Sequence, residues 1–89
     1  TLKHRDAARV EATASLLVSH CRPIFRERVL GPDVPVVPRV RDQYIRHVLV
    51  KLDKGRYRAE KNSLAQVVDA LRNDPEHRAV RIIVDVDPI

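Results

Sequence analysis

Two aspartates near the end of the sequence, Asp85 and Asp87, have the spacing of an acid/base pair or of half a metal site. Residues two apart on a strand point to the same side, which puts the two carboxyl groups roughly 7 Å apart. Paired carboxylates at such a separation can hydrolyse glycosides or bind hard cations. The sequence places no third carboxylate, histidine or glycine-rich loop to complete the site, and Pro88 marks a strand end. Solvated or partner-contacting carboxylates are therefore the favoured interpretation.

The other side chains that often carry chemistry do not form a recognisable set. The four histidines show no ligand spacing, and a single cysteine excludes both an internal disulfide and a multi-cysteine zinc site. Cys21 falls on the apolar stripe of a predicted helix, where it acts as a small hydrophobic residue. The two glycines, Gly31 and Gly55, are too few for the known phosphate-binding loops. The sequence thus predicts no catalytic residue, no metal site and no cofactor.

The strongest signal is a basic segment between residues 39 and 61. The net charge of +5 lies entirely in this segment, which has eight cationic and three acidic side chains, while the rest of the chain is balanced. Arginine binds phosphate oxygens bidentately and lysine binds them as a point charge, so the segment predicts a phosphate-bearing or acidic partner. Tyr44 and Tyr57 lie within it and could stack on unpaired bases. The alternative is an ordinary solvated face, with Tyr44 half buried in the core. The cationic residues are Arg39, Arg41, Arg46, Lys51, Lys54, Arg56, Arg58 and Lys61.

The elements that position these residues begin with a helix over residues 6–22. Asp6 is the predicted N-cap, and Pro23 is expected to end or kink the helix. Apolar residues recur at helical spacing up to Ile24. A second helix carries the stripe Leu64, Val67, Val68 and Leu71; Ser63 and Gln66 are spaced as a capping box, although the helix could begin earlier.

Three strands alternate with these helices. Residues 28–30 are expected to form a short strand that Gly31-Pro32 stops, and residues 43–52 an inner strand that is apolar on both faces. Residues 80–87 form the last strand, with Val80, Ile82, Val84 and Val86 on one face. With Leu2 in a first strand that is clipped at its start, the order is β-α-β-β-α-β. This order predicts an α+β fold with both helices on one face of a small sheet.

Length and composition limit the class of protein. Eighty-nine residues form one domain, and 44% hydrophobic with 33% charged residues is typical of a small globular chain. No apolar run approaches the roughly 20 residues needed to span a bilayer, and the first residues do not form a secretory signal. We therefore expect a cytoplasmic domain, without a membrane partner, that is cut from a longer protein.

The whole sequence resembles the C-terminal domain of the PriA-type primosomal replication-restart helicase, primosomal protein N′. The most specific pieces are Leu30-Gly31-Pro32 and the terminal Asp85-Val86-Asp87-Pro88, together with the order of the elements between them. The resemblance implies a fold similar to that of a small-subunit ribosomal protein. It also implies a bacterial, nucleoid-associated protein whose ATP, magnesium and zinc sites lie in other domains of the parent helicase, so that this fragment is not itself an enzyme.

The resemblance further implies three partners: branched DNA, the helicase core of the same chain, and the acidic tail of single-stranded DNA-binding protein. DNA contacts carried over from the family fall on Arg41, Arg46 and Lys51, and the tail contact falls on Arg58.

Two main hypotheses follow for the basic segment. The first is a DNA-binding module that contacts fork or single-stranded DNA through Arg39, Arg41, Tyr44, Arg46, Lys51, Lys54 and Arg56. The alternative is a protein-docking module in which Arg58 and Lys61 hold an acidic tail. An RNA-binding domain like a ribosomal protein is a third hypothesis, and an enzyme built on Asp85 and Asp87 is the least favoured one.

Overall fold

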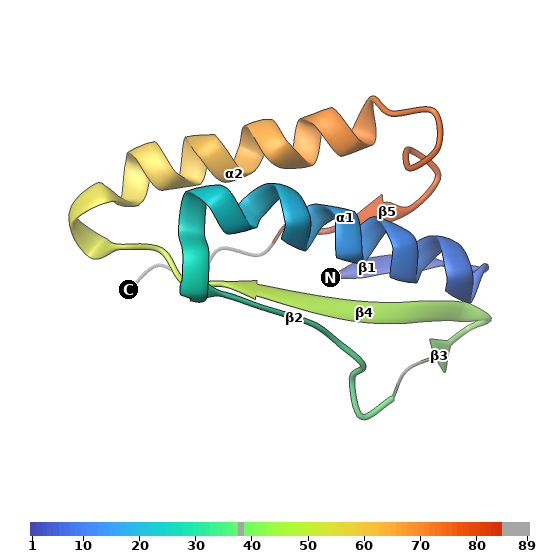
Figure 1. Cartoon of the computed structure of the whole chain (residues 1–89). Helices are drawn as coiled ribbons and strands as arrows, with labels where there is room; N and C mark the ends of the chain where they lie inside the picture. Colours follow the sequence, from blue (N-terminus) through green and yellow to red (C-terminus); the bar gives the residue numbers. More distant parts are fainter. Residues whose placement is uncertain (38, 85–89) are drawn as a thin grey trace.

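An antiparallel sheet with two helices on one of its faces makes up the fold (Figure 1). The computed structural model describes residues 1–37 and 39–84, so Asp85 and Asp87 lie outside the described residues. The predicted α+β class is confirmed, and the order of the elements is the expected one with a short extra strand inserted. The elements are β1 (Leu2–His4), α1 (Ala7–Phe25), the 3-10 turn η1 (Arg26–Arg28), β2 (Val29–Asp33), β3 (Arg39–Val40), β4 (Gln43–Val50), the 3-10 turn η2 (Lys54–Arg56), α2 (Tyr57–Arg72) and β5 (Arg81–Ile82).

Strand β4 is the centre of the sheet. The strand order is β2-β4-β1-β5, and β3 pairs with β4 near its start. Residues Arg41 and Asp42 join β3 to β4, and both have positive φ angles, 53° and 65°. Two positive φ angles in a two-residue connection are the geometry of a type I′ hairpin turn. The sequence did not predict this hairpin, because it lacks the Asn-Gly or Asp-Gly pair that usually marks one.

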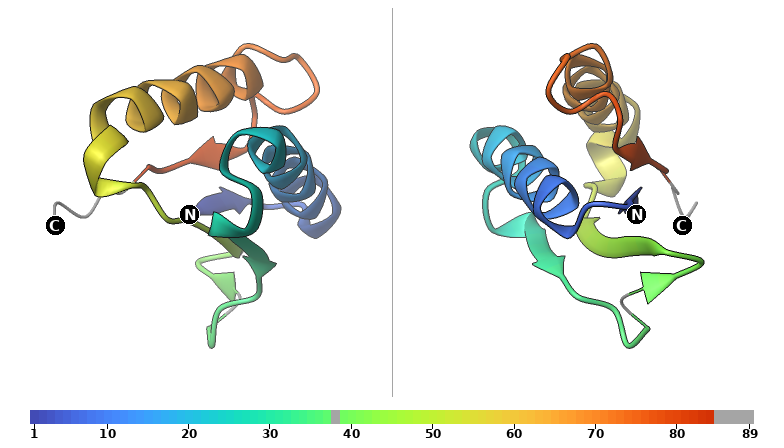
Figure 2. Two further views of the ribbon diagram at one scale, coloured as in Figure 1. Left: turned by 60° about the vertical axis from the view of Figure 1, so that its left-hand side comes forward. Right: turned by 90° about the vertical axis from the view of Figure 1, so that its right-hand side faces the viewer.

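The two faces of the sheet differ. In β4, Tyr44, Val48 and Val50 pack against the core beneath the helices, whereas Leu49 on the other face is 56% exposed. The prediction of an inner strand is confirmed, because β4 has neighbours on both sides. Its second face is apolar as predicted but only partly covered, since Ile45 is 8% exposed and Leu49 is 56% exposed, and both helices lie on the other side of the sheet (Figure 2).

Helix α1 runs further than the sequence predicts. Asp6 is the N-cap as expected, and its carboxylate accepts hydrogen bonds from the backbone N–H groups of Ala8 and Arg9. Pro23 lies inside the helix, which ends at Phe25. Proline in the last turn removes one backbone hydrogen bond, and the complete burial of Phe25 holds that turn in place. The predicted stripe position Ile24 is 42% exposed, so Phe25 takes the core place instead.

The other boundaries also shift. Strand β2 continues through Gly31 to Asp33 rather than stopping, with an irregular register against β4. Helix α2 begins at Tyr57, and the Ser63 hydroxyl donates to the carbonyl of Ala59 instead of capping a helix start. Strand β5 ends at Ile82, and Val84 is 45% exposed.

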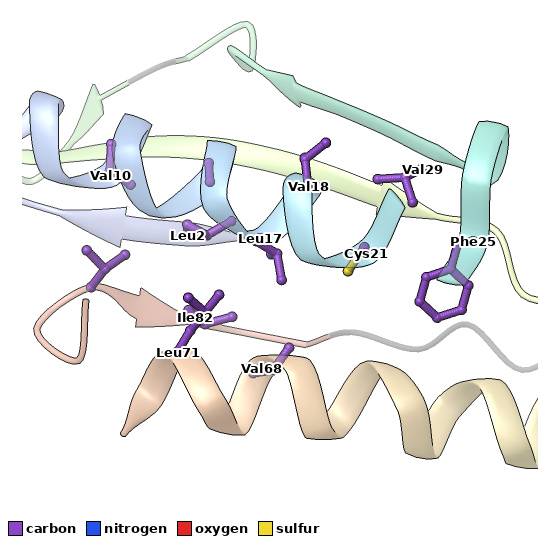
Figure 3. Close-up of a cluster of buried hydrophobic side chains, with 12 residues drawn as sticks. Leu2, Val10, Leu17, Val18, Cys21, Phe25, Val29, Val68, Leu71 and Ile82 are labelled. Atoms are coloured by element: carbon purple, nitrogen blue, oxygen red, sulfur yellow. The ribbon is translucent and has the colours of Figure 1, made fainter. Parts of the chain in front are cut away.

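The core lies between the sheet and the two helices. Figure 3 shows its side chains, with α1 contributing half of them and α2 closing the far side. Thr13 is completely buried, and its hydroxyl lies 2.7 Å from Nδ1 of His77, so the one buried hydroxyl of α1 is satisfied by the loop before β5. The described core residues are Leu2, Val10, Ala14, Leu17, Val18, Cys21, Phe25, Val29, Val68, Leu71, Val80 and Ile82. Neither α1 nor α2 is long and apolar enough to cross a membrane.

Candidate nucleic-acid interface

Three of the predicted DNA-contacting residues lie at the hairpin between β3 and β4. The Arg39 guanidinium is 3.0 Å from the Asp42 carboxylate and lies over the Tyr44 ring, 5.2 Å from its centroid. Tyr44 is partly buried and packs against the core, as the alternative interpretation of the sequence expects. Arg41 is exposed at the tip of the turn and makes no ion pair within the described residues. The hairpin therefore presents one uncommitted guanidinium and no free stacking platform.

Arg46 is held by α1. Its side chain is 14% exposed, Nε donates to Oε2 of Glu11 at 2.7 Å, and Nη1 donates to the carbonyl of Ile45 at 2.8 Å. A phosphate would have to displace the Glu11 carboxylate to reach this guanidinium. The position predicted for DNA contact thus also has a structural role, since it joins the central strand to the helix layer.

The turn η2 and the start of α2 carry the densest group of exposed cations. Lys51, Lys54, Arg56 and Arg58 are all exposed, and none forms an ion pair within residues 1–37 and 39–84. The backbone N–H groups at the start of α2 receive no side-chain cap, so they add a positive partial charge at the same place. We call these four residues the basic corner.

The two carboxylates nearest to the basic corner are engaged elsewhere. Oδ1 of Asp53 accepts a hydrogen bond from the N–H of Gly55 at 2.9 Å. Glu60 is 7% exposed and receives two hydrogen bonds from the Arg28 guanidinium and one from the N–H of Asp53. The bond from Arg28, followed by that from the Asp53 backbone, lowers the pKa of Glu60 to about 2. The basic corner therefore keeps most of its positive charge for an external partner.

The structure does not bring the predicted basic residues into one patch. The hairpin with Arg39 and Arg41 and the start of α2 lie at opposite ends of β4 (Figure 1). An eight-residue strand is roughly 26 Å long, so a small ligand cannot contact both ends. Lys61 lies further along α2, with its ammonium 6.0 Å from the centroid of the Tyr57 ring.

An apolar groove runs between α2 and the C-terminal half of β4. Its volume is about 850 Å³, and Lys51 and Tyr57 lie on its wall. A smaller hollow of about 210 Å³ next to Leu64 is lined by Lys61 and Arg72. The apolar residues around the larger groove include Leu17, Val48, Val50, Leu52, Leu64, Val68 and Ile82.

Neither the one cysteine nor the metal-ligating side chain types form a reactive site in the described part of the chain. Burial raises the pKa of the Cys21 thiol to about 11, which keeps it protonated and unreactive at neutral pH. Among residues 1–37 and 39–84, no three His, Cys, Asp or Glu side chains are grouped so that they could hold a metal ion.

Comparison with known proteins gives one family. The family model described as the primosomal protein N C-terminal domain matches residues 1–89. No curated protein and no solved structure gives a significant match. The match covers both ends of the chain, including the Leu30-Gly31-Pro32 and terminal Asp-Val-Asp-Pro pieces on which the resemblance was based, and it confirms that resemblance.

Proposed function

The chain belongs to the family of primosomal protein N C-terminal domains, which gives it a role in the primosome and replication restart, and from this premise we propose that it is a non-catalytic DNA-binding domain. The observation that carries the proposal is the basic corner, whose exposed cations Lys51, Lys54, Arg56 and Arg58 lie on the chain between the end of β4 and the first turn of α2, a helix start without a side-chain cap. Helix starts with exposed N–H groups and nearby cations favour phosphate. On this proposal the ATP, magnesium and zinc chemistry belongs to other parts of a parent helicase in the bacterial cytoplasm.

Binding at the basic corner should depend on salt and hardly on sequence. Contacts to phosphate position a protein on DNA but carry no base information, and the described residues at this corner include no free aromatic ring other than the half-buried Tyr57. We therefore expect the domain to bind forked and single-stranded DNA of different sequences with similar affinity. Arg41 at the hairpin tip and Arg39 are the remaining predicted contacts, and they would reach a separate part of a long DNA substrate.

The test is a salt titration of binding to a fluorescently labelled fork. We expect the variant Lys54→Ala/Arg56→Ala to reduce the slope of log K against log salt by about 2, because each lost phosphate contact removes about one unit. The matched control is Arg9→Ala/Arg22→Ala, which removes the same charge from exposed positions on α1. Equal slopes for wild type, variant and control would contradict the proposal.

A second function is favoured by the apolar groove beside Lys51 and by the smaller hollow that Lys61 lines: docking of an acidic peptide that ends in an apolar residue, such as the tail of single-stranded DNA-binding protein. Arg58 and Lys61 are three residues apart on α2 and lie on neighbouring parts of its surface. The apolar end would enter the groove, and the carboxylates would meet these two cations. The helicase core of the same chain is a further proposed partner.

Titration calorimetry with such a peptide tests the second function. We expect Arg58→Glu/Lys61→Glu to weaken binding by at least tenfold, because two attractions become repulsions, whereas Arg9→Glu/Arg22→Glu should leave the affinity nearly unchanged. Absence of measurable heat with the wild-type protein, or equal losses in both variants, would rule out this docking site.

A further inference from the structure

The face of the sheet that is turned away from the helices carries two cations that are separate from the basic corner. Leu2 of β1, Val29 of β2 and Ile82 of β5 are buried against the helices. Side chains alternate along a strand, so their neighbours lie on the opposite face. Figures 1 and 2 show that both helices lie on the other side of the sheet. We call this surface the open face; Ile45 on it is buried, at 8% exposure, and Asp33 lies in register with His47. Its strand residues are Lys3, Leu30, Asp33, Ile45, His47, Leu49 and Arg81.

Lys3 and Arg81 lie directly opposite each other in the register of β1 and β5. The side chains of such a pair start about 5 Å apart, where like charges destabilise a sheet unless an anion compensates them. Arg39 and Arg46, the other Lys or Arg residues within the described strands, each pair with a carboxylate. Lys3 and Arg81 have no carboxylate partner among residues 1–37 and 39–84. Two adjacent cations held on neighbouring strands without a carboxylate form a preset site for an anion.

The rest of the open face indicates which anion. Leu30 and Leu49 are in register and are 41% and 56% exposed, whereas Ile45, in register with Lys3, is 8% exposed. Phe, Tyr and Trp are absent from the strand residues of this face, and the exposed imidazole of His47 is the one ring that they offer to a base. A cation pair beside an apolar strip suits a sugar-phosphate backbone, with phosphate on the cations and deoxyribose on the leucines.

We propose that Lys3 and Arg81 together bind a backbone phosphate of DNA on the open face. The proposal rests on the proposed DNA-binding function and extends it to a surface distinct from the basic corner, because η2 and the start of α2 lie beyond the end of β4. A DNA strand would then follow the open face, and contact at this pair would add to contact at the corner.

The experiment measures binding of the labelled fork by anisotropy at several salt concentrations. We expect Lys3→Ala/Arg81→Ala to weaken binding at least tenfold at low salt and to reduce the salt slope by about 2. Lys3→Arg/Arg81→Lys, which keeps both charges, should bind like the wild type, and Arg9→Ala/Arg22→Ala controls for net charge. Thermal melting followed by circular dichroism shows whether each variant is folded.

The outcomes separate this inference from the proposed function. If the wild type binds DNA and Lys3→Ala/Arg81→Ala binds equally well, the inference is overturned while the DNA-binding function stands. If the wild type fails to bind at any salt concentration, both fall. If the variant keeps its DNA affinity but loses affinity for an acidic peptide, the inference is also overturned and the open face becomes a protein-docking surface.

Discussion

Replacement of Gly31 by alanine is expected to lower the free energy of unfolding by about 3 kcal/mol. Gly31 has a φ angle of +111°, which residues with a side chain rarely adopt. A Cβ atom there would lie 2.8 Å from the carbonyl oxygen of His47 and 3.1 Å from the nitrogen of Asp33. Both neighbours are backbone atoms, and His47 belongs to the central strand, so the clash cannot be relieved by turning a side chain.

Gly55→Ala is the matched control. Gly55 lies in the exposed turn η2 without a positive φ angle, and the nearest atom to its added Cβ would be the Asp53 carboxylate oxygen at an ordinary 3.6 Å. We expect this variant to unfold in urea at nearly the wild-type concentration. Denaturation followed by circular dichroism compares the two. Similar midpoints for both alanine variants would show that Gly31 is not required by the backbone.

The role of Gly31 also explains part of the family pattern. Leu30-Gly31-Pro32 is one of the pieces that carry the resemblance, and the structure places Gly31 where β2 changes register against β4. A substitution there would disturb the position of Leu30 on the open face. The sequence alone suggested a stop for the strand, because glycine followed by proline usually interrupts one.

Periodicity was sufficient to predict both helices and the strands other than β3. The stripe of α2 and the alternation of β4 follow from spacing alone, and the α+β class follows from their order. Helix boundaries were harder to predict. In α1 the burial of Phe25 outweighs the tendency of Pro23 to end the helix. Such tertiary contacts are not visible in a window of a few residues.

The candidate site could be predicted only in part. Counting charges along the chain found the basic segment, but it could not show that Glu11, 35 residues from Arg46, occupies that guanidinium. Counting charges also did not identify Lys3 and Arg81. They lie near opposite ends of the chain, outside residues 39–61, where cationic and acidic side chains are equal in number. Only the pairing of β1 with β5 brings these two together.

The last prediction concerns the ion pair beneath the basic corner. Arg28 and Glu60 form two hydrogen bonds, Arg28 also donates to the carbonyls of Phe25 and Lys51, and Glu60 accepts from the N–H of Asp53. The pair thus joins the end of α1, the end of β4 and the start of α2. Replacing Glu60 with glutamine removes the charge while Arg28 remains, and we expect the melting temperature at pH 7 to fall by about 10 °C.

The same pair fixes how stability depends on pH. The Arg28 hydrogen bonds lower the pKa of Glu60 from its ordinary value of 4.5 to about 2. A carboxylate whose pKa is lower in the folded state stabilises the fold fully above the unfolded value and loses that contribution as the pH falls towards the folded one. The Glu60 contribution should therefore be complete above about pH 5, decline between pH 4.5 and 2, and be absent below pH 2.

Melting curves of wild type and Glu60→Gln between pH 7 and pH 2 test this dependence. Their melting temperatures should differ most at neutral pH and converge near pH 2, because the wild-type carboxyl is then protonated and resembles the amide. Arg28→Lys keeps a positive charge but loses the planar donor pair, so it should fall between the two at pH 7. A constant gap between wild type and Glu60→Gln across the whole range would mean that the glutamate acts through its shape and packing, and not through its charge.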